Sequence, residues 1–326
     1  MNHVPDEHDD LPGDPAAADH VTDDPSGHDA VLLNETLDAL QPAPGKIIID
    51  CTLGRGGHSS AIAARLSPGG LLIGIDADPR NLEYASARVR RAAPDTHARF
   101  FHANFAEVDD VLAAAEIDAV DGILADLGLS TNQLFDEQYG LSFQQPMPLD
   151  MRIDPRIDKT AADLVNTMRE DDLANVLYEL AQERYSRRIA RKIGEARRVS
   201  PILTTDRLAD LVRSAIPRRG GGPASEQKID PATRTFMALR MAVNREVDNL
   251  ATLLERAPRR LKPGGRLAVI SFHSTEDRMV KQAFRSAEQT GGLIAILTKR
   301  PLSPTDDETA RNPRSRSAKL RVSEKT

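Results

Sequence analysis

A short β-branched run, a glycine-rich turn and an alanine-rich segment follow one another early in the chain. Residues 46–50 (Lys-Ile-Ile-Ile-Asp) have the composition of a buried parallel strand. Three glycines lie in the turn at 51–58, where a backbone without Cβ atoms can pass close beneath a ligand. Residues 59–66 predict a helix. This order is typical of the nucleoside-binding corner of a doubly wound α/β sheet.

The spacing of small residues in this turn bears on the cofactor. A dinucleotide fingerprint needs a third glycine where this chain has Ser59. Asp50 followed by alternating small residues instead resembles the first motif of S-adenosylmethionine-dependent methyltransferases. Asp76 ends a second predicted strand at 71–76, and a carboxylate there can accept ribose hydroxyls in either cofactor class. An NAD-dependent oxidoreductase, or a purely structural glycine turn with a helix-capping aspartate, stays as an alternative.

Length and composition exclude several classes of protein. A chain of 326 residues has room for about two domains. Its single cysteine, Cys51, excludes an internal disulfide framework and a CxxC metal pair. No apolar run approaches the roughly 20 residues that cross a bilayer, and no secretory signal begins the chain. The sequence therefore predicts a cytoplasmic protein without a membrane partner.

Charge is distributed unevenly along the chain. The net charge is −6, but residues 1–30 hold nine acidic side chains and no Lys or Arg, so the other 296 residues carry +3. The acidic segment at 1–28 is too polar to bury a core and is predicted to be disordered. Basic residues cluster at 184–198, 218–222 and 311–321. Each cluster alone could be a solvated helix face, but three together favour a polyanionic partner.

Further apolar runs supply the other strands of the predicted sheet. They lie at 99–105, 121–126, 262–271, 293–298 and 318–322. About a hundred residues separate the fourth strand from the fifth, far more than the dozen or so that a crossover needs, so we expect an inserted helical subdomain. Helical patterns lie at 160–168, 171–198, 205–216 and, opened by a proline, 231–260.

A second motif, Asp-Leu-Gly-Leu-Ser-Thr-Asn-Gln at 126–133, begins where the fourth strand ends. Ligands of open α/β sheets bind at the carboxyl ends of the strands. Amino-methyltransferases usually carry Asp-Pro-Pro-Tyr at this place, to hold the target amine beside the methyl group. Asp126 and its position agree with that pattern, whereas Pro-Pro-Tyr is absent.

Together the motifs resemble the bacterial small-subunit ribosomal RNA cytosine-N4 methyltransferases of the MraW/RsmH type. Matching segments run in order from about residue 28 to the carboxyl end, at 31–35, 54–58, 76–79, 126–130, 148–152, 183–190, 231–236, 271–274, 276–277 and 312–316. The chain departs from the pattern at Asp230, where a histidine is expected, and at Met237, where a glutamine is expected. Both departures are expected to affect the boundary of the insert and not the cofactor pocket.

The resemblance implies a Rossmann-like methyltransferase fold with an inserted helical subdomain for substrate recognition. The implied divisions are a disordered acidic tail at 1–28, a methyltransferase domain at 29–135 and 231–326, and the insert at 136–230. Its substrate would be a cytidine of 16S ribosomal RNA near the decoding centre, within the small ribosomal subunit or its precursor. The sequence leaves the oligomeric state open, a homodimer included.

The resemblance also implies a binding site for S-adenosyl-L-methionine. Gly56, Gly57 and His58 would line its methionine and ribose side, and Asp76 would bind the ribose hydroxyls. His58 by itself would be an ordinary packing residue at a helix start, and only the neighbouring glycines favour a role at the cofactor. No metal is expected to be needed.

Three further residues would complete this site. Phe105, at the end of the third predicted strand, would pack against the adenine, although an aromatic there is also typical of a plain core. Asp126 and Gln133 would close the site near the methionine end and the target. Asp126 is the expected catalytic residue, because an acceptor there could hold one N–H of the amine and turn its lone pair toward the methyl carbon. The proton would then pass to a carboxylate or to water.

The substrate would be bound by basic and aromatic side chains. Arg187, Arg188 and Arg191 lie one turn apart or adjacent on a predicted helix, so they can share a face toward phosphates. The target base must be unpaired or flipped out, and His273, Tyr139 or Phe143 could stack on it. A non-catalytic RNA-binding protein would keep the basic clusters and could lose the cofactor residues, which this chain retains.

Overall fold

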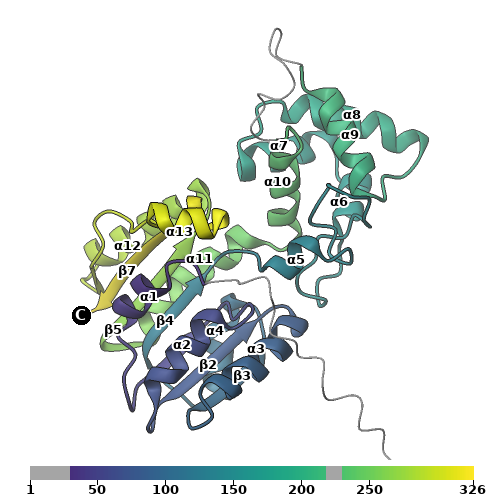
Figure 1. Cartoon of the computed structure of the whole chain (residues 1–326). Helices are drawn as coiled ribbons and strands as arrows, with labels where there is room; N and C mark the ends of the chain where they lie inside the picture. Colours follow the sequence, from purple (N-terminus) through teal and green to yellow (C-terminus); the bar gives the residue numbers. More distant parts are fainter. Residues whose placement is uncertain (1–29, 218–229) are drawn as a thin grey trace, which may run out of the picture.

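The computed structural model describes residues 30–217 and 230–326, and its centre is one seven-stranded sheet (Figure 1). The strand order is β3-β2-β1-β4-β5-β7-β6. The strands are β1 (Ile47–Asp50), β2 (Leu71–Asp76), β3 (His97–His102), β4 (Val120–Asp126), β5 (Leu261–Ser271), β6 (Ile294–Ile296) and β7 (Lys319–Lys325). Strands β1 to β5 pair in parallel, whereas β7 runs antiparallel to β5 and β6. The predicted doubly wound α/β class is confirmed.

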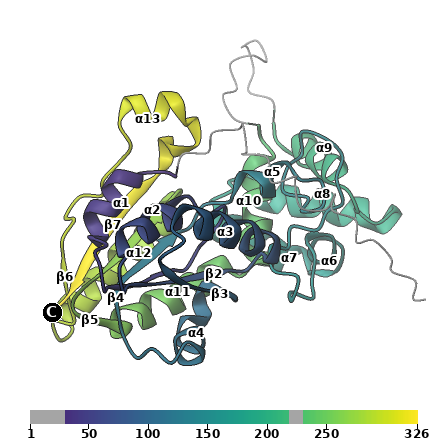
Figure 2. The same cartoon turned by 60° about the horizontal axis from the view of Figure 1, so that its bottom comes forward.

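Helices cover both faces of this sheet (Figure 2). One face carries α1 (Leu33–Leu40), α2 (Gly57–Leu66) and α3 (Pro79–Ala92), and the other carries α4 (Val108–Ala114), α11 (Glu246–Arg256) and α12 (Ser274–Gln289). Side chains alternate along β1, so Ile48 packs in the first core and Ile49 in the second. The other elements of the sheet domain are short: η2 (Phe105–Glu107), η4 (Ala257–Arg260), α13 (Asp306–Arg311) and η5 (Pro313–Ser317).

The parallel strands bring three carboxylates to one edge of the sheet. Strand β1 lies between β2 and β4, and the three strands end at Asp50, Asp76 and Asp126. The edge formed by the carboxyl ends of parallel strands is where ligands of such sheets bind. The strands predicted at 46–50 and 121–126 pair as β1 and β4, which places the two motifs of the sequence side by side.

The third strand ends earlier than the sequence predicted. It was expected at 99–105, but β3 ends at His102 and Phe105 begins the 3₁₀-helix η2. The physical reason is a cap at Asn104: its side chain accepts a hydrogen bond from Ala106 N (3.0 Å), and Glu107 accepts one from Asn104 N (2.5 Å). This reciprocal pair turns the chain into a helix directly after the strand.

The long connection between β4 and β5 forms a helical insert, visible at the upper right of Figure 1. Its helices are α5 (Thr131–Phe135), α6 (Ala161–Thr167), α7 (Glu170–Ala181), α8 (Ser186–Val199), α9 (Thr205–Ala215) and α10 (Thr233–Val243). They enclose an apolar core of their own, separate from the two cores of the sheet. The acidic tail predicted at 1–28 and the basic cluster at 218–222 lie outside the described residues. Within the described ranges, every helix is too short or too polar to span a bilayer.

Two long helices predicted from the sequence are each divided in two. The pattern at 171–198 forms α7 and α8, which are separated by Gln182 with a φ of 53°. The pattern at 231–260 forms α10 and α11, which are separated by Arg245 with a φ of 51°. A residue in the left-handed region ends a helix. Neither break involves Gly or Pro, the residues that announce one in a sequence.

The break at Arg245 changes where the insert ends. Phe236, Leu239 and Val243 of α10 pack in the core of the insert, together with Leu173 and Leu177 of α7. We therefore place the end of the insert near residue 243 and not at 230. Helix α11, by contrast, packs through Leu250 and its neighbours on the sheet.

Candidate active site

Two cavities adjoin at the carboxyl end of β4. The first, of about 120 Å³, is lined by Asp76, Phe105 and Gln133 and by residues of the insert. The second, of about 340 Å³, is lined by His58 and other residues at the start of α2. Asp126 lines both cavities. The structure thus brings the residues of both sequence motifs to one divided site.

The position of Asp126 is set by the turn after β1. Its backbone N–H donates to Thr52 Oγ1 (2.6 Å), which ties the end of β4 to that turn. Asp126 Oδ1 is buried and has no hydrogen-bond partner among the described residues. Burial raises the pKa of this carboxyl to about 7. The side chain is therefore close to the boundary between its neutral and charged forms at physiological pH.

His58 lies in the first turn of α2 and contacts two other parts of the site. Its Nε2 lies 3.0 Å from the carbonyl oxygen of Val31, and its Nδ1 lies 3.6 Å from Asp126 Oδ2. Burial lowers the pKa of the ring. His58 lines the second cavity, so the structure places it beside Asp126, on the opposite side from Asp76.

Asp76 lies at the wall of the first cavity with its carboxylate held by the backbone. Oδ2 accepts a hydrogen bond from Gly54 N (2.7 Å), and Oδ1 accepts one from Asp78 N (2.8 Å). Burial nevertheless raises the pKa of Asp76 to about 7. Each oxygen keeps a second lone pair, so the carboxylate can still accept two hydroxyl groups of a ligand.

The three glycines of the turn have different surroundings. Gly54 lines both cavities, and Gly57 lines the second. Gly56 has a φ of 75°, and a Cβ there would lie 3.1 Å from the Cβ of Ala85 on α3. Gly56 is therefore required for a left-handed backbone and for the close packing of the turn on α3. Its expected contact with the cofactor stays a prediction.

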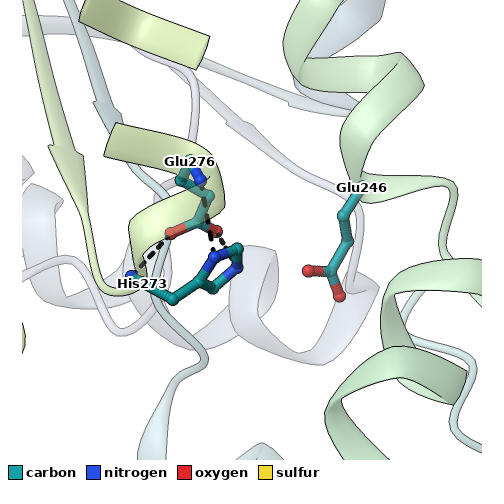
Figure 3. Close-up of side chains that lie close together, drawn as sticks. All are labelled: Glu246, His273 and Glu276. Carbon is teal, nitrogen blue, oxygen red and sulfur yellow. Dashed lines mark hydrogen bonds and ion pairs between the residues drawn. The ribbon is translucent and has the colours of Figure 1, made fainter. Parts of the chain in front are cut away.

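Glu246, His273 and Glu276 form a cluster that faces the cavities (Figure 3). One ligand atom from each lies within 4.8 Å of the others, an arrangement that could hold a metal ion. Both carboxylates already have donors, however. Glu246 pairs with Arg240 (2.7 Å), and Glu276 accepts from Phe272 N (2.9 Å) at the start of α12. An ion pair and a helix cap thus account for the cluster, and we assign no metal to it.

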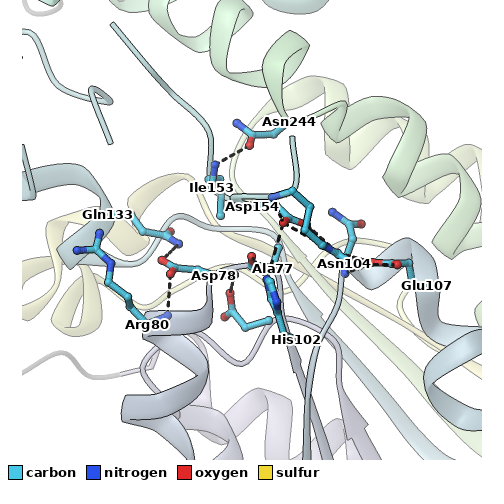
Figure 4. A network of polar contacts seen from close by, with 12 residues as sticks. Ala77, Asp78, Arg80, His102, Asn104, Glu107, Gln133, Ile153, Asp154 and Asn244 are labelled. Atoms are coloured by element: carbon cyan, nitrogen blue, oxygen red, sulfur yellow. Dashed lines mark hydrogen bonds and ion pairs between the residues drawn. The ribbon is translucent and has the colours of Figure 1, made fainter. Parts of the chain in front are cut away.

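A polar network connects the first cavity to the insert (Figure 4). Gln133 Nε2 donates to Asp78 Oδ2 (3.0 Å), which also accepts from the hydroxyl of Tyr139. Arg80 Nε donates to the same hydroxyl (3.0 Å). Gln133 therefore lies on the Asp76 side of the site, and Tyr139 is buried in the network. The stacking role considered for Tyr139 is thereby excluded.

Asn244 holds the segment at 151–153 of the insert against the break between α10 and α11. Its Oδ1 accepts from Ile153 N (2.9 Å), and its Nδ2 donates to the carbonyl oxygens of Met151 (2.8 Å) and Arg240 (2.9 Å), part of which is drawn in Figure 4. Ile153 and Asn244 both line the first cavity. This junction was not predicted, because its partners are about 90 residues apart and carry no motif.

Replacing Asn244 with Ala should destabilise the protein. The change leaves buried backbone groups of residues 151 and 153 without partners, which costs roughly 1–3 kcal/mol in the free energy of unfolding. Urea denaturation followed by circular dichroism measures the loss. Thr252→Ala on the adjoining helix is the control, since it removes only an exposed hydrogen bond (3.0 Å) within the helix and should change stability by less than about 0.5 kcal/mol. Equal losses in both variants would contradict the role of the junction.

The ring-bearing residues considered for the site do not all line its cavities. Phe105 lines the first cavity, as expected for a residue that packs on adenine, and it also contacts the core below. Phe143 packs on Phe236 (ring centroids 4.6 Å apart) in the core of the insert, so it is not placed to stack on a base. His273 caps α12 and lines both cavities. Of the three candidates for stacking, His273 alone lies at the site.

The second cavity carries cationic side chains that were not predicted from the sequence. Arg55, Arg88, Arg240 and Arg314 line it, and Arg314 donates to the carbonyl oxygen of Leu129 (2.8 Å). The other three carried no signal in the sequence, whereas Arg314 falls in the basic cluster at 311–321. Both departures from the family pattern are also resolved. Met237 packs on the core of the insert and lines the second cavity but not the first, and Asp230 pairs with Arg213 (2.9 Å).

The arginines expected to bind RNA lie on α8 of the insert. Arg187, Arg188 and Arg191 are all exposed, and Arg191 lies 3.9 Å from Glu170. Tyr185, which precedes the helix, is 39% exposed. This face of α8 is therefore accessible to a polyanion, as the predicted binding of RNA requires.

Comparison with known proteins decides the family. Residues 25–326 match the MraW methylase family. The chain belongs to this family. Ribosomal RNA small subunit methyltransferase H of Syntrophotalea carbinolica is 46% identical, over 90% of this chain and 96% of that protein. The protein of the same name from Geobacter sulfurreducens is 46% identical, over 91% of this chain and 98% of its own length. Family membership confirms a methyltransferase with S-adenosylmethionine as its cofactor, and it excludes the oxidoreductase alternative.

Proposed function

We propose that the chain transfers the methyl group of S-adenosylmethionine to N4 of a cytidine in small-subunit ribosomal RNA, near the decoding centre. The observation that carries the proposal is the position of Asp126 on the wall shared by two cavities. One cavity can take the cofactor and the other the target base, with the carboxylate between them. The names of the two relatives support ribosomal RNA of the small subunit as the substrate class.

The residues of the first cavity fit the cofactor. Asp76 offers two carboxylate oxygens to the ribose hydroxyls, and Phe105 offers an apolar ring to the adenine. Gly54 leaves room for the methionine chain, because it carries no Cβ. When bound, the cofactor supplies a methyl group that its positively charged sulfur has already activated. The protein therefore contributes mainly by placing the two reactants.

The second cavity supports a flipped-out nucleotide. A base inside a helix cannot reach a buried carboxylate, so it must leave its stack. Arg55, Arg88 and Arg314 line this cavity and carry the charge that a phosphate backbone attracts. His273 can contact the base from the start of α12.

Asp126 can correct the poor nucleophilicity of the cytosine amine. The lone pair of N4 is conjugated into the ring, which keeps the amine planar and unreactive. A carboxylate oxygen that accepts one N–H turns this lone pair toward the methyl carbon. The side chain of Asp126 is 21% exposed while its Oδ1 is buried, so Oδ2 is the oxygen that can accept that N–H.

Methyl transfer from labelled cofactor tests the proposed function directly. Small-subunit RNA, alone and within assembled or precursor subunits, is incubated with the protein, then digested and separated into nucleosides. We expect label in N4-methylcytidine and in no other nucleoside. Label on ring carbon 5 or on a ribose hydroxyl would contradict the proposed target atom, and absence of label from every RNA substrate would contradict the proposed substrate class.

Replacing Arg187, Arg188 and Arg191 together with Ala should weaken binding of RNA and flatten its dependence on salt. The log–log slope should fall by roughly 0.7 for each phosphate of single-stranded RNA that an arginine no longer neutralises. Cofactor affinity should stay within about twofold, because α8 lies in the insert and does not line either cavity among the described residues. Fluorescence anisotropy at several salt concentrations measures the slope.

A matched triple variant serves as the control for this experiment. Arg278, Lys281 and Arg285 lie about one turn apart along α12 and are also exposed. Their replacement with Ala removes the same charge from another helix, so general electrostatic attraction changes equally in both variants. If the two variants lose the same affinity and slope, α8 is not the specific RNA face.

A further inference from the structure

His58 and Asp126 both line the second cavity, and their side chains face one another. The distance from His58 Nδ1 to Asp126 Oδ2 is 3.6 Å, and the two side chains come from different elements, α2 and β4. The exposed fractions of the side chains are 7% and 21%. Catalytic hydrogen bonds are often longer than normal before a substrate is bound and shorten in the complex. The pair is thus positioned to form one.

The other ring nitrogen decides which form of the imidazole is present. His58 Nε2 lies 3.0 Å from the carbonyl oxygen of Val31, which can only accept a hydrogen bond. Nε2 must therefore carry the hydrogen. Burial lowers the pKa of His58, so the ring is neutral and Nδ1 presents a lone pair to Asp126. A charged carboxylate gains nothing from that lone pair, whereas a protonated one can donate to it.

Four charged side chains surround the pair, but none of them offers Asp126 the interaction that His58 offers. Asp50 and Glu308 face His58, and Glu276 and Arg314 face Asp126. The negative charge of Glu276 disfavours a second negative charge at Asp126, and the positive charge of Arg314 favours it. His58 Nδ1 differs from these four groups because it offers a neutral lone pair to Asp126 Oδ2, at 3.6 Å.

We propose that His58 is the positioning residue of proton removal: its Nδ1 accepts a hydrogen bond from Asp126 once Asp126 has taken the proton of the target amine. The inference rests on the proposed function. The lone pair of N4 forms the bond to the methyl carbon, and the carbon–sulfur bond breaks with its electron pair left on sulfur. The amine then loses one proton to Asp126, and the electrons of that N–H bond return to nitrogen. Oδ2–H of Asp126 donates to His58 Nδ1, which stabilises the protonated carboxyl.

A double-mutant cycle separates this role from a structural one. His58→Leu removes both ring nitrogens, whereas His58→Gln has a similar volume and keeps one donor and one acceptor. We expect single-turnover methyl transfer to fall roughly 100-fold in His58→Leu, at the low end of general acid–base effects, and to fall much less in His58→Gln. In an Asp126→Asn background, His58→Leu should lower the single-turnover rate by less than about twofold, because His58 acts through the carboxyl of Asp126.

The alternative is that His58 only anchors the chain at Val31. If His58 were only an anchor, His58→Leu would lower the rate of methyl transfer by the same factor in the wild-type and Asp126→Asn backgrounds. This outcome would overturn the proposal. Binding of S-adenosylhomocysteine, measured by calorimetry, should stay within about twofold in His58→Gln. Thermal unfolding of each variant reports whether the anchor is lost.

A measurement without turnover tests the interaction itself. Nitrogen-15 NMR of the histidine rings, with His58 assigned by its loss in His58→Gln, gives its tautomer and its pKa in the ligand-free protein. We expect hydrogen on Nε2 in the wild type, and a clear change in the Nδ1 shift and the pKa in Asp126→Asn. Identical titrations in wild type and Asp126→Asn would overturn the proposal, even where His58→Leu does not fold.

The outcomes also separate this proposal from the proposed function. If the wild type forms no N4-methylcytidine, the proposed function fails, and the NMR comparison still reports on the pair. If the wild type forms it and His58→Leu is equally fast, the proposed function stands and the role of His58 is wrong.

Discussion

Asp126→Asn is expected to slow single-turnover methyl transfer by roughly 100- to 10,000-fold, the range for loss of a general base. Asparagine has nearly the same shape, so the site should stay intact, but its amide cannot take the proton of the amine. Cofactor and RNA affinities should remain close to those of the wild type. Rapid-quench assays with labelled cofactor measure the rate, and calorimetry measures the binding.

The pH dependence of the same step provides a second check. Burial raises the pKa of Asp126 to about 7, and only the ionised carboxylate can accept the proton. The wild-type rate should therefore rise as the pH increases from 6 to 8 and level off above that, whereas the Asn variant should lack this rise. Asp110→Asn, on the exposed surface of α4, is the matched control. Full activity in Asp126→Asn would exclude the assigned role.

Asp76→Ala is expected to weaken cofactor binding by ~1–3 kcal/mol, or roughly 5- to 150-fold. The change removes the acceptor for the ribose hydroxyls. It also leaves the N–H groups of Gly54 and Asp78, which donate to Asp76 at 2.7 Å and 2.8 Å, without their partner. Part of the loss will therefore come from the turn itself. Asp76→Asn keeps an acceptor oxygen and should lose less affinity.

The raised pKa of Asp76 gives binding and stability opposite dependences on pH. Burial raises this pKa to about 7, and hydroxyl donors prefer the ionised carboxylate, so cofactor affinity should increase as the pH rises through 7. In the ligand-free protein, a carboxyl whose folded pKa exceeds its unfolded value contributes stability at low pH that is lost as the pH rises through 7. Calorimetric titrations at pH 6 and 8 test the first statement. An unchanged affinity in a folded Asp76→Ala variant would remove Asp76 from the cofactor site.

Local chemistry is what the sequence by itself determined. The strand at 46–50, the turn after it and the strands that end at Asp76 and Asp126 were predicted correctly, because each depends on a few adjacent residues. The parallel order of the strands then required these carboxylates to meet at one edge of the sheet. The class of fold followed from those two facts, and the proposed site lies at the edge where these strands end.

Interactions between distant segments were decided only by the tertiary structure. Gln182 and Arg245 end helices in left-handed conformations because the helices on either side pack in different directions, and no residue type announces such a break. Asn244 closes a junction with partners about 90 residues away. His58 contacts Asp126, 68 positions along the chain, and no pattern in the sequence indicated this contact. A side chain's neighbours depend on how the elements pack, and a linear pattern holds no information on that distance.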